Sequence, residues 1–359
     1  MNKKLSLILC TSLGIALFAA LLTVASLFDL QISEALTAGS LPEGEYYSTN
    51  GFALFFEIVG FAVFYLSGAI ASLISVAAAI KLNEGDPFLF LKSIKGIAYK
   101  IVKPVLITGF SAFGVYEMYC VVHEPFKYSQ KYLQDALSGT TASFTLNSAH
   151  LIAVQVLFAA IISGLVLALL VHVKKENIFK LVKIAIILFL VELLYLAVVD
   201  AVKTPVGRMR YRTMNAIGDF SYYTPWYVIN GARHVFPDGT IGTGNLDSST
   251  LLGAASDTCK SFPSGHTYGA TMSFALVCLP DLFEKFKKTW VKAICWTVPA
   301  AYTVTVAICR IVVGAHYFSD VLVGGTLAFT LIMLLREVLV LKCAHFKAFK
   351  KPKPDGESE

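Results

Sequence analysis

The stretch from residue 149 to residue 172, AHLIAVQVLFAAIISGLVLALLVH, decides the fold class of this chain. It contains no Asp, Glu, Lys or Arg. A helix rises about 1.5 Å per residue, so this stretch is long enough to cross the roughly 30 Å hydrocarbon core of a bilayer. Because backbone amides in lipid must bond within their own segment, the stretch predicts a transmembrane helix.

Similar apolar segments lie on both sides of it. Of the 359 residues, 56% are hydrophobic and only 15% are charged, whereas a soluble domain has about 25% charged residues. We therefore predict an all-α, polytopic transmembrane helix bundle of about eight spans. The expected spans are 5–27, 53–80, 102–122, 149–172, 183–201, 264–283, 292–312 and 317–341.

Positive charge alternates between the connectors of these segments. Two thirds of the 30 Lys and Arg fall in every second connector and at the two ends of the chain, as in residues 81–100, 174–183 and 285–292. The positive-inside rule then predicts both termini in the cytoplasm and no role in nucleic-acid binding for the net charge of +6. The first segment is favoured as a retained helix because it exceeds the usual length of a signal peptide core. A signal peptide cleaved near Ala25 is the alternative.

The predicted outer loop 202–263 breaks this pattern. Its cations are Lys203, Arg208, Arg210, Arg212, Arg233 and Lys260. An anionic ligand is the simplest reason for cations on the side where they should be depleted, and a surface for anionic lipid headgroups is the alternative.

The first motif of this region pairs Lys203 with Arg210. Seven positions along a helix would put both side chains on one face, with Arg208 as a third cation. A point charge and a planar fork both suit phosphate oxygens. The spacing alone is weak, because such pairs arise by chance.

The second motif is FPSGHT, residues 262–267. Ser264 is expected to cap a helix, and Gly265 would let the backbone approach a ligand closely. The amides at the start of the helix would then face an anion. His266 beside them is placed to protonate a leaving oxygen.

The third motif joins Arg310, His316 and Asp320. His316 and Asp320 are four positions apart, so they can touch on a helix or its first turn. A carboxylate on one imidazole nitrogen fixes the tautomer and makes the other nitrogen a better nucleophile. Arg310 would neutralise a phosphoryl group in transfer.

Together, these three motifs resemble those of the type 2 phosphatidic acid phosphatase superfamily over about residues 183–341. The resemblance implies a nucleophile that forms a phosphohistidine (His316), a residue that orients it (Asp320) and a general acid (His266). It also implies phosphate-binding residues and no metal or cofactor. The implied phosphate-binding residues are Lys203, Arg210, Ser264, Gly265 and Arg310.

The chain departs from the family pattern in three ways. Tyr211 stands where Pro usually follows the first motif, and Cys309 stands where Ser usually opens the third. Four spans precede the core, whereas two are usual. We divide the chain into N-terminal helices (1–176), a phosphatase core (177–343) and a disordered cytoplasmic tail (344–359).

Several further residues have two interpretations. Glu57, Glu117 and Glu192 lie within apolar spans, where they would line a substrate cavity or make helix contacts while protonated. Cys120 and Cys259 fall on the predicted outer side; free thiols are favoured over a disulfide. The aromatic run at 222–227 would guide a lipid tail or pack the loop.

These observations predict an integral membrane phosphatase that hydrolyses a phosphomonoester or diphosphate. A lipid is favoured as its substrate because the site lies at membrane level. The alternatives are a lipid phosphotransferase with the same intermediate and a non-catalytic transporter or scaffold. The expected partners are the bilayer and the phosphorylated lipid, and the oligomeric state stays open. We expect a bacterial inner membrane, with the site facing the periplasm or exterior.

Overall fold

A computed structural model describes residues 3–86, 95–136, 149–236, 239–244 and 257–342. The expected tail at 344–359 lies outside these ranges. The N-terminal half forms α1 (Lys3–Thr37), α2 (Gly51–Val59), α3 (Ala62–Lys81), α4 (Gly96–Ala136) and α5 (Ala149–His172). The chain then continues through α6 (Lys175–Leu194), the π-helical turn η1 (Tyr195–Val199), α7 (Asp200–Val206), α8 (Tyr211–Ile217) and the 3₁₀ turn η2 (Phe220–Tyr222).

A short antiparallel hairpin of β1 (Arg233–Val235) and β2 (Ile241–Thr243) follows. The remaining elements are α9 (Gly265–Thr271), η4 (Met272–Cys278), α10 (Leu279–Leu282), η5 (Glu284–Phe286), α11 (Thr289–Val312), α12 (Phe318–Leu335) and η6 (Arg336–Val340).

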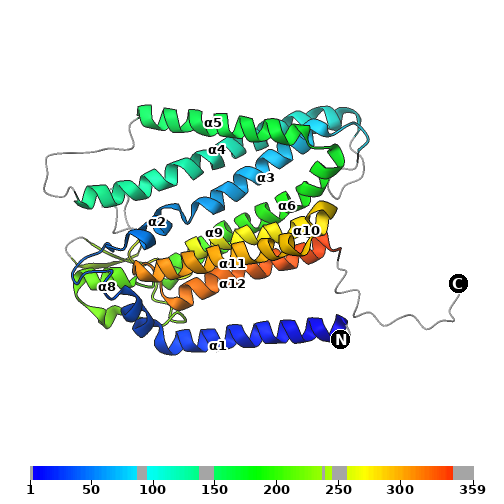
Figure 1. The fold of residues 1–359 in the computed structure, drawn as a ribbon. Coiled ribbons are helices and arrows are strands. Elements are labelled where there is room, and N and C mark those ends of the chain that lie inside the picture. Colours follow the sequence, from blue (N-terminus) through cyan, green and yellow to red (C-terminus); the bar gives the residue numbers. More distant parts are fainter. Residues whose placement is uncertain (1–2, 87–94, 137–148, 237–238, 245–256, 343–359) are drawn as a thin grey trace.

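The long helices run side by side along one direction, with α1 and α5 on opposite sides of the molecule (Figure 1). α3 packs mainly against α4 and α6, whereas α9 packs against α11 and α12. α2 lies against α11, so the N-terminal helices meet the C-terminal ones at this contact. The all-α bundle predicted from the sequence is confirmed.

Seven helices of the described chain are long and apolar enough to cross a membrane. They are Thr11–Thr37, Gly51–Lys81, Gly96–Gln130, Ala149–His172, Lys175–Ile217, Thr289–Val312 and Phe318–Val340. The predicted span at 264–283 is not among them. It forms α9, η4 and α10 in succession, and every residue of α9 is buried. This segment carries polar residues such as Thr267 and Thr271 because protein surrounds it.

α4 extends well past the predicted span 102–122. It continues through Pro125 to Ala136, over residues that the sequence assigns to an outer loop. This extension brings Tyr128 and Tyr132 to the end of the bundle where α8 lies.

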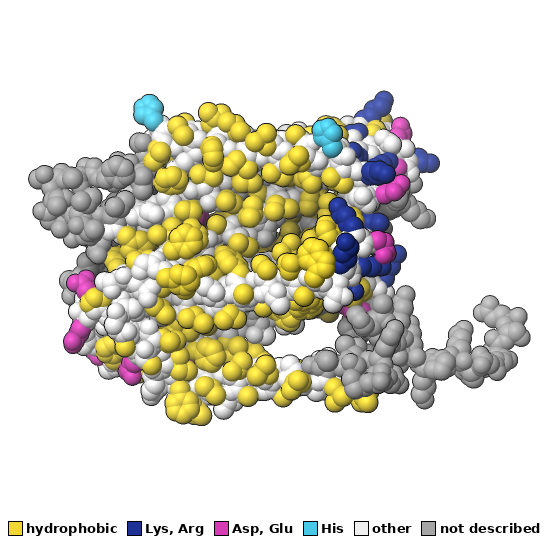
Figure 2. All heavy atoms as spheres, viewed as in Figure 1, with side chains coloured by type: hydrophobic (Ala, Val, Ile, Leu, Met, Phe, Trp, Pro, Cys, Tyr) yellow, Lys and Arg dark blue, Asp and Glu magenta, His cyan; other side chains and the backbone are white. Residues whose placement is uncertain are grey.

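Lys and Arg side chains gather at one end of the face shown in Figure 2. This is the end at which α3 finishes and α6 begins, opposite α8 in Figure 1. The exposed lysines in and beside the α3–α4, α5–α6 and α10–α11 connections include Lys95, Lys100, Lys174, Lys180, Lys285, Lys287 and Lys288.

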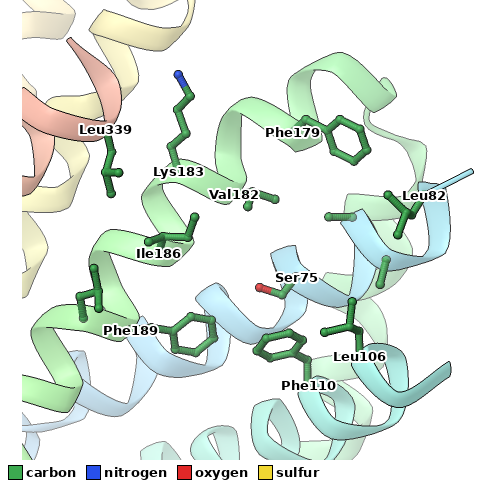
Figure 3. Close-up of a pocket in the computed structure, with 13 residues that line it drawn as sticks. Ser75, Leu82, Leu106, Phe110, Phe179, Val182, Lys183, Ile186, Phe189 and Leu339 are labelled. Atoms are coloured by element: carbon green, nitrogen blue, oxygen red, sulfur yellow. The ribbon is translucent and has the colours of Figure 1, made fainter. Parts of the chain in front are cut away.

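A cavity of about 530 Å³ lies near this lysine-rich end, and Figure 3 shows residues that line it. α3, α4 and α6 line it with apolar side chains such as Leu106, Phe110 and Phe189; Lys183 also lines it. No residue of the three sequence motifs borders this cavity, so it is separate from the site described next.

Candidate active site

The three motifs converge at the end of the bundle where α8 lies. The second motif opens α9 and the third joins α11 to α12. The Ser264 amide donates to the Asp320 carbonyl over 3.0 Å, which ties the two motifs together. A Cβ atom at Gly324 would lie 2.4 Å from the Ser264 carbonyl oxygen, so only glycine permits this approach.

Ser264 caps α9 as the sequence predicts. Its side chain accepts from the Thr267 amide over 3.4 Å. A Cβ atom at Gly265 would lie 3.3 Å from Lys203 Nζ and 2.6 Å from Tyr195 Oη. The structure therefore brings the lysine of the first motif beside the start of α9.

His316 is buried and its tautomer is fixed by a backbone carbonyl. Its Nδ1 lies 2.6 Å from the Ser261 carbonyl oxygen. Because a carbonyl can only accept, Nδ1 carries the proton and the lone pair is on Nε2. Burial lowers the pKa of His316 to about 3, so the neutral imidazole is the stable form at neutral pH.

Asp320 acts on His316 indirectly, through Ser261. The distance from Asp320 Oδ2 to His316 Nδ1 is 3.7 Å, beyond a hydrogen bond. The carboxylate instead accepts from the Ser261 hydroxyl and, over 2.9 Å, from the Tyr317 amide. Asp320 thus holds Ser261, whose carbonyl holds His316. The spacing therefore brings Asp320 beside the His316 ring, as expected, but the hydrogen bond of Nδ1 goes to the Ser261 carbonyl.

Arg208 is committed to buried carboxylates and is not a third phosphate cation as the sequence suggested. It lies 2.6 Å from Asp320 and 3.0 Å from Asp29, and its guanidinium stacks 4.0 Å from the Tyr317 ring centroid. Asp29 also accepts from the Ser319 amide over 2.9 Å. This network joins α1 to the start of α12.

Lys203 and Arg210 do not share one helix face, so that prediction is wrong. α7 ends at Val206 because Gly207 adopts a left-handed φ of 56°. Arg210 then caps α8, where it pairs with Asp257 over 2.8 Å and donates to the Ala315 carbonyl over 3.0 Å. The bend places Lys203 beside Gly265 and Arg210 beside the loop before His316.

Glu57 is the site residue whose role sequence reasoning missed. It lies on α2, whose start is fixed by the Asn50 side chain accepting from the Ala53 amide over 3.0 Å. Its Oε1 lies 2.7 Å from Arg310 NH1 and 2.9 Å from Arg212 NH1. The available signal was a charge inside an apolar span, which also singled out Glu117 and Glu192.

His266 meets the same residue through the backbone. Its Nε2 lies 3.1 Å from the Glu57 carbonyl oxygen, and Arg310 and His316 are near enough to act on it electrostatically. The rings of Phe61 and Tyr128 lie 5.3 Å and 5.5 Å from the His266 ring. The proposed acid is therefore enclosed partly by the N-terminal helices.

The other residues with two interpretations lie outside this cluster. Glu117 and Glu192 face each other across Gly68, where a Cβ atom would be within 3 Å of both carboxyl groups. Cys120 and Cys259 are both free and buried, as favoured from the sequence. Trp226 stacks on Phe262 at 5.9 Å, which supports loop packing for that side chain.

The cluster combines the parts of a phosphoryl-transfer site. It holds an imidazole with a lone pair, a second imidazole, and guanidinium groups beside the amides of a helix start. Arg310 Nε and NH1 are both buried, and neither makes a hydrogen bond to any residue that the structure describes, although NH1 lies 2.7 Å from Glu57 Oε1. Phosphate oxygens would satisfy these donors.

Comparisons with known proteins agree with this geometry. No curated protein and no solved structure matches the chain. The PAP2 superfamily model matches residues 180–342, which include all three motifs, and this part of the chain is a PAP2 superfamily core within a multi-pass membrane protein of phosphatase type.

Proposed function

We propose that the chain hydrolyses a lipid phosphomonoester or diphosphate through a phosphohistidine on His316. The observation that carries the proposal is the hydrogen bond from His316 Nδ1 to the Ser261 carbonyl. This bond leaves the neutral Nε2 as a nucleophile without any prior loss of a proton.

The reaction has two balanced steps. Nε2 of His316 attacks phosphorus, the bond to the leaving oxygen breaks, and that oxygen takes a proton from His266, which begins the cycle as the doubly protonated imidazolium. Water then gives its proton to His266 as it attacks the phosphohistidine, which releases phosphate and restores neutral His316. Lys203, Arg210 and Arg310 balance the charge of the phosphoryl oxygens, with the amides after Ser264.

A lipid substrate is supported by the position of the site at the end of a membrane bundle. Tyr227 and Ile229 are 59% and 75% exposed in the loop that packs on α7. Such apolar side chains suit the level of lipid headgroups. The exposed lysines at the opposite end support a site on the non-cytoplasmic face, which is the periplasmic face in a bacterial inner membrane.

Phosphate release by detergent-purified protein tests this function. The substrates are a panel of lipid and soluble phosphates in EDTA, with His316→Ala in parallel. We expect release from a lipid phosphate without added metal and a loss of about a thousandfold or more in the variant, as when a nucleophile is removed. Among the described residues, no His, Cys, Asp and Glu cluster could hold a metal ion, and metal independence stays a prediction until this assay.

Added alcohols distinguish hydrolysis from phosphoryl transfer. A new phosphate ester in place of free phosphate would identify the phosphotransferase. If the wild type releases no phosphate, or His316→Ala keeps its activity, the histidine mechanism is wrong and a transporter or scaffold becomes the better interpretation.

A further inference from the structure

We propose that Glu57 is a positioning residue for this reaction, and that it is the contribution of the N-terminal helices to catalysis. It would hold the phosphate-binding Arg310 through its carboxylate and the acid His266 through its carbonyl. This inference rests on the proposed function, because both residues have roles in it.

The carboxylate of Glu57 is fully engaged. It is 1% exposed, it contacts Arg310 and Arg212 through Oε1, and Oε2 accepts from the Tyr132 hydroxyl. The contact with Arg310 is an ion pair through NH1 that forms no hydrogen bond, and Nε is a second buried donor without a hydrogen bond among the described residues. Glu57 thus holds the guanidinium by an ion pair and leaves its two buried donors for a ligand.

The charge balance favours positioning over simple neutralisation. Glu57 stands between two guanidinium groups, so the cluster of Glu57, Arg212 and Arg310 keeps one net positive charge. Arg212 has an additional partner, the Tyr46 ring, whose centroid is 4.6 Å away. An anionic phosphate therefore still meets a cation, and the orientation of that cation depends on Glu57.

The backbone of Glu57 completes the arrangement. Its carbonyl accepts from Nε2 of His266 over 3.1 Å, which keeps a proton on that nitrogen. In the doubly protonated ring that the acid step needs, Nδ1 is then the nitrogen that gives the proton to the leaving oxygen and later takes one from water. Glu57 of α2 thereby orients both Arg310 and His266 of the C-terminal core.

The surrounding side chains keep Glu57 in place. Tyr132 of α4 donates to it, while Phe61 and Tyr128 lie against the ring of His266. All three come from the helices that precede the family core. These helices thus close one side of the site.

The test compares Glu57→Gln with Glu117→Gln. Both remove a buried carboxylate from the N-terminal helices, but Glu117 is eleven residues before Tyr128 on α4, roughly 16 Å away along the helix axis. We measure kcat/KM on the lipid phosphate cleaved by the wild type, and the affinity for inorganic phosphate by calorimetry. We expect Glu57→Gln to lower kcat/KM about 100-fold and to weaken phosphate binding, because small misplacements of a binding group have this cost. Glu117→Gln should change neither.

Two further variants separate positioning from folding. Glu57→Gln leaves two buried cations without a carboxylate, so Glu57→Gln with Arg212→Gln restores the charge balance if the single variant does not fold. We expect the pair to remain as impaired as Glu57→Gln. Arg310→Lys already removes the guanidinium that Glu57 contacts. In this background, Glu57→Gln should lower kcat/KM less than about threefold, since the two residues act as one unit.

Three results would overturn the inference. Wild-type activity in Glu57→Gln with Arg212→Gln would mean that Glu57 only neutralises Arg212. Tighter phosphate binding in Glu57→Gln would mean that the carboxylate competes with substrate. An equal loss in the wild-type and Arg310→Lys backgrounds would mean that Glu57 does not act through Arg310. If the wild type cleaves lipid phosphates and His316→Ala does not, any of these leaves the proposed function intact; a wild type that cleaves nothing overturns both.

Discussion

At the residue scale, the imidazole of His316 depends on a chain of contacts. Arg208 holds Asp320, Asp320 holds the Ser261 hydroxyl, and the Ser261 carbonyl holds Nδ1 of His316. A carbonyl partner does not become charged with pH, so it fixes the tautomer over a wide range. The nucleophile is oriented by the backbone, and the carboxylate supports that backbone.

The pH dependence of kcat/KM follows from this burial. The neutral imidazole is the active form, and burial lowers the pKa of His316 to about 3. The loss of activity that comes from protonation of His316 should therefore occur only in strong acid, well below pH 6.5. The profile is measured on the lipid phosphate and corrected for the substrate's own ionisation near pH 6. An acid limb at about 6.5 that remains after this correction would contradict a buried, neutral nucleophile.

At the element scale, the bend between α7 and α8 sets the first motif. A Cβ atom at Gly207 would lie 1.9 Å from the Gly231 carbonyl oxygen, and the φ of 56° disfavours any other residue. Lys203 and Arg210 therefore depend on this glycine for their different positions.

Gly207→Ala tests the importance of the bend. We expect a loss of thermal stability in detergent, from about 1–2 kcal/mol of backbone strain plus the clash, together with reduced kcat/KM. Gly164→Ala on α5 is the matched control, since nothing lies within 4 Å of its Cβ. Unchanged stability and activity in Gly207→Ala would show that the bend is not required.

The sequence predicted the helices and the three motifs, but not how some of them are placed. Apolar length is a local property, so most spans were predictable. The segment 264–283 is less apolar than a helix that faces lipid. It is buried in protein, and burial in protein tolerates polar residues, unlike burial in lipid. The helix expected from Lys203 to Arg210 was broken by Gly207, whose conformation depends on the loop at Gly231.

At the scale of the whole molecule, the N-terminal helices complete the site of the C-terminal core. Glu57 reaches Arg310, and Asp29 of α1 reaches Arg208 and α12. Spacing within one motif cannot reveal such partners, because they are far apart along the chain. The sequence identified Glu57 as a charge inside a span that would line a substrate cavity or contact another helix, without indicating its partners.

The ion pair between Asp29 of α1 and Arg208 predicts that Asp29→Asn lowers stability. The variant leaves Arg208 with one carboxylate fewer in a buried network, so thermal stability in detergent should fall by roughly 1–3 kcal/mol. Asp281→Asn is the control, because its pair with Arg336 is about 20% exposed on both sides and should contribute less than about 1 kcal/mol. Equal effects of the two variants would show that α1 is not held to the core through Asp29.

The most direct test of the account is to trap the phosphohistidine. An aryl phosphate with a good leaving group needs no acid, so His266→Ala should form the intermediate and hydrolyse it slowly. Radiolabelled substrate is mixed with this variant, the reaction is quenched in alkali, and the labelled peptide is identified. We predict label on the peptide that contains His316, and none after His316→Ala is added to the same background. Label on another residue, or turnover in the wild type with no label on His316 in any variant, would contradict a histidine nucleophile in this protein.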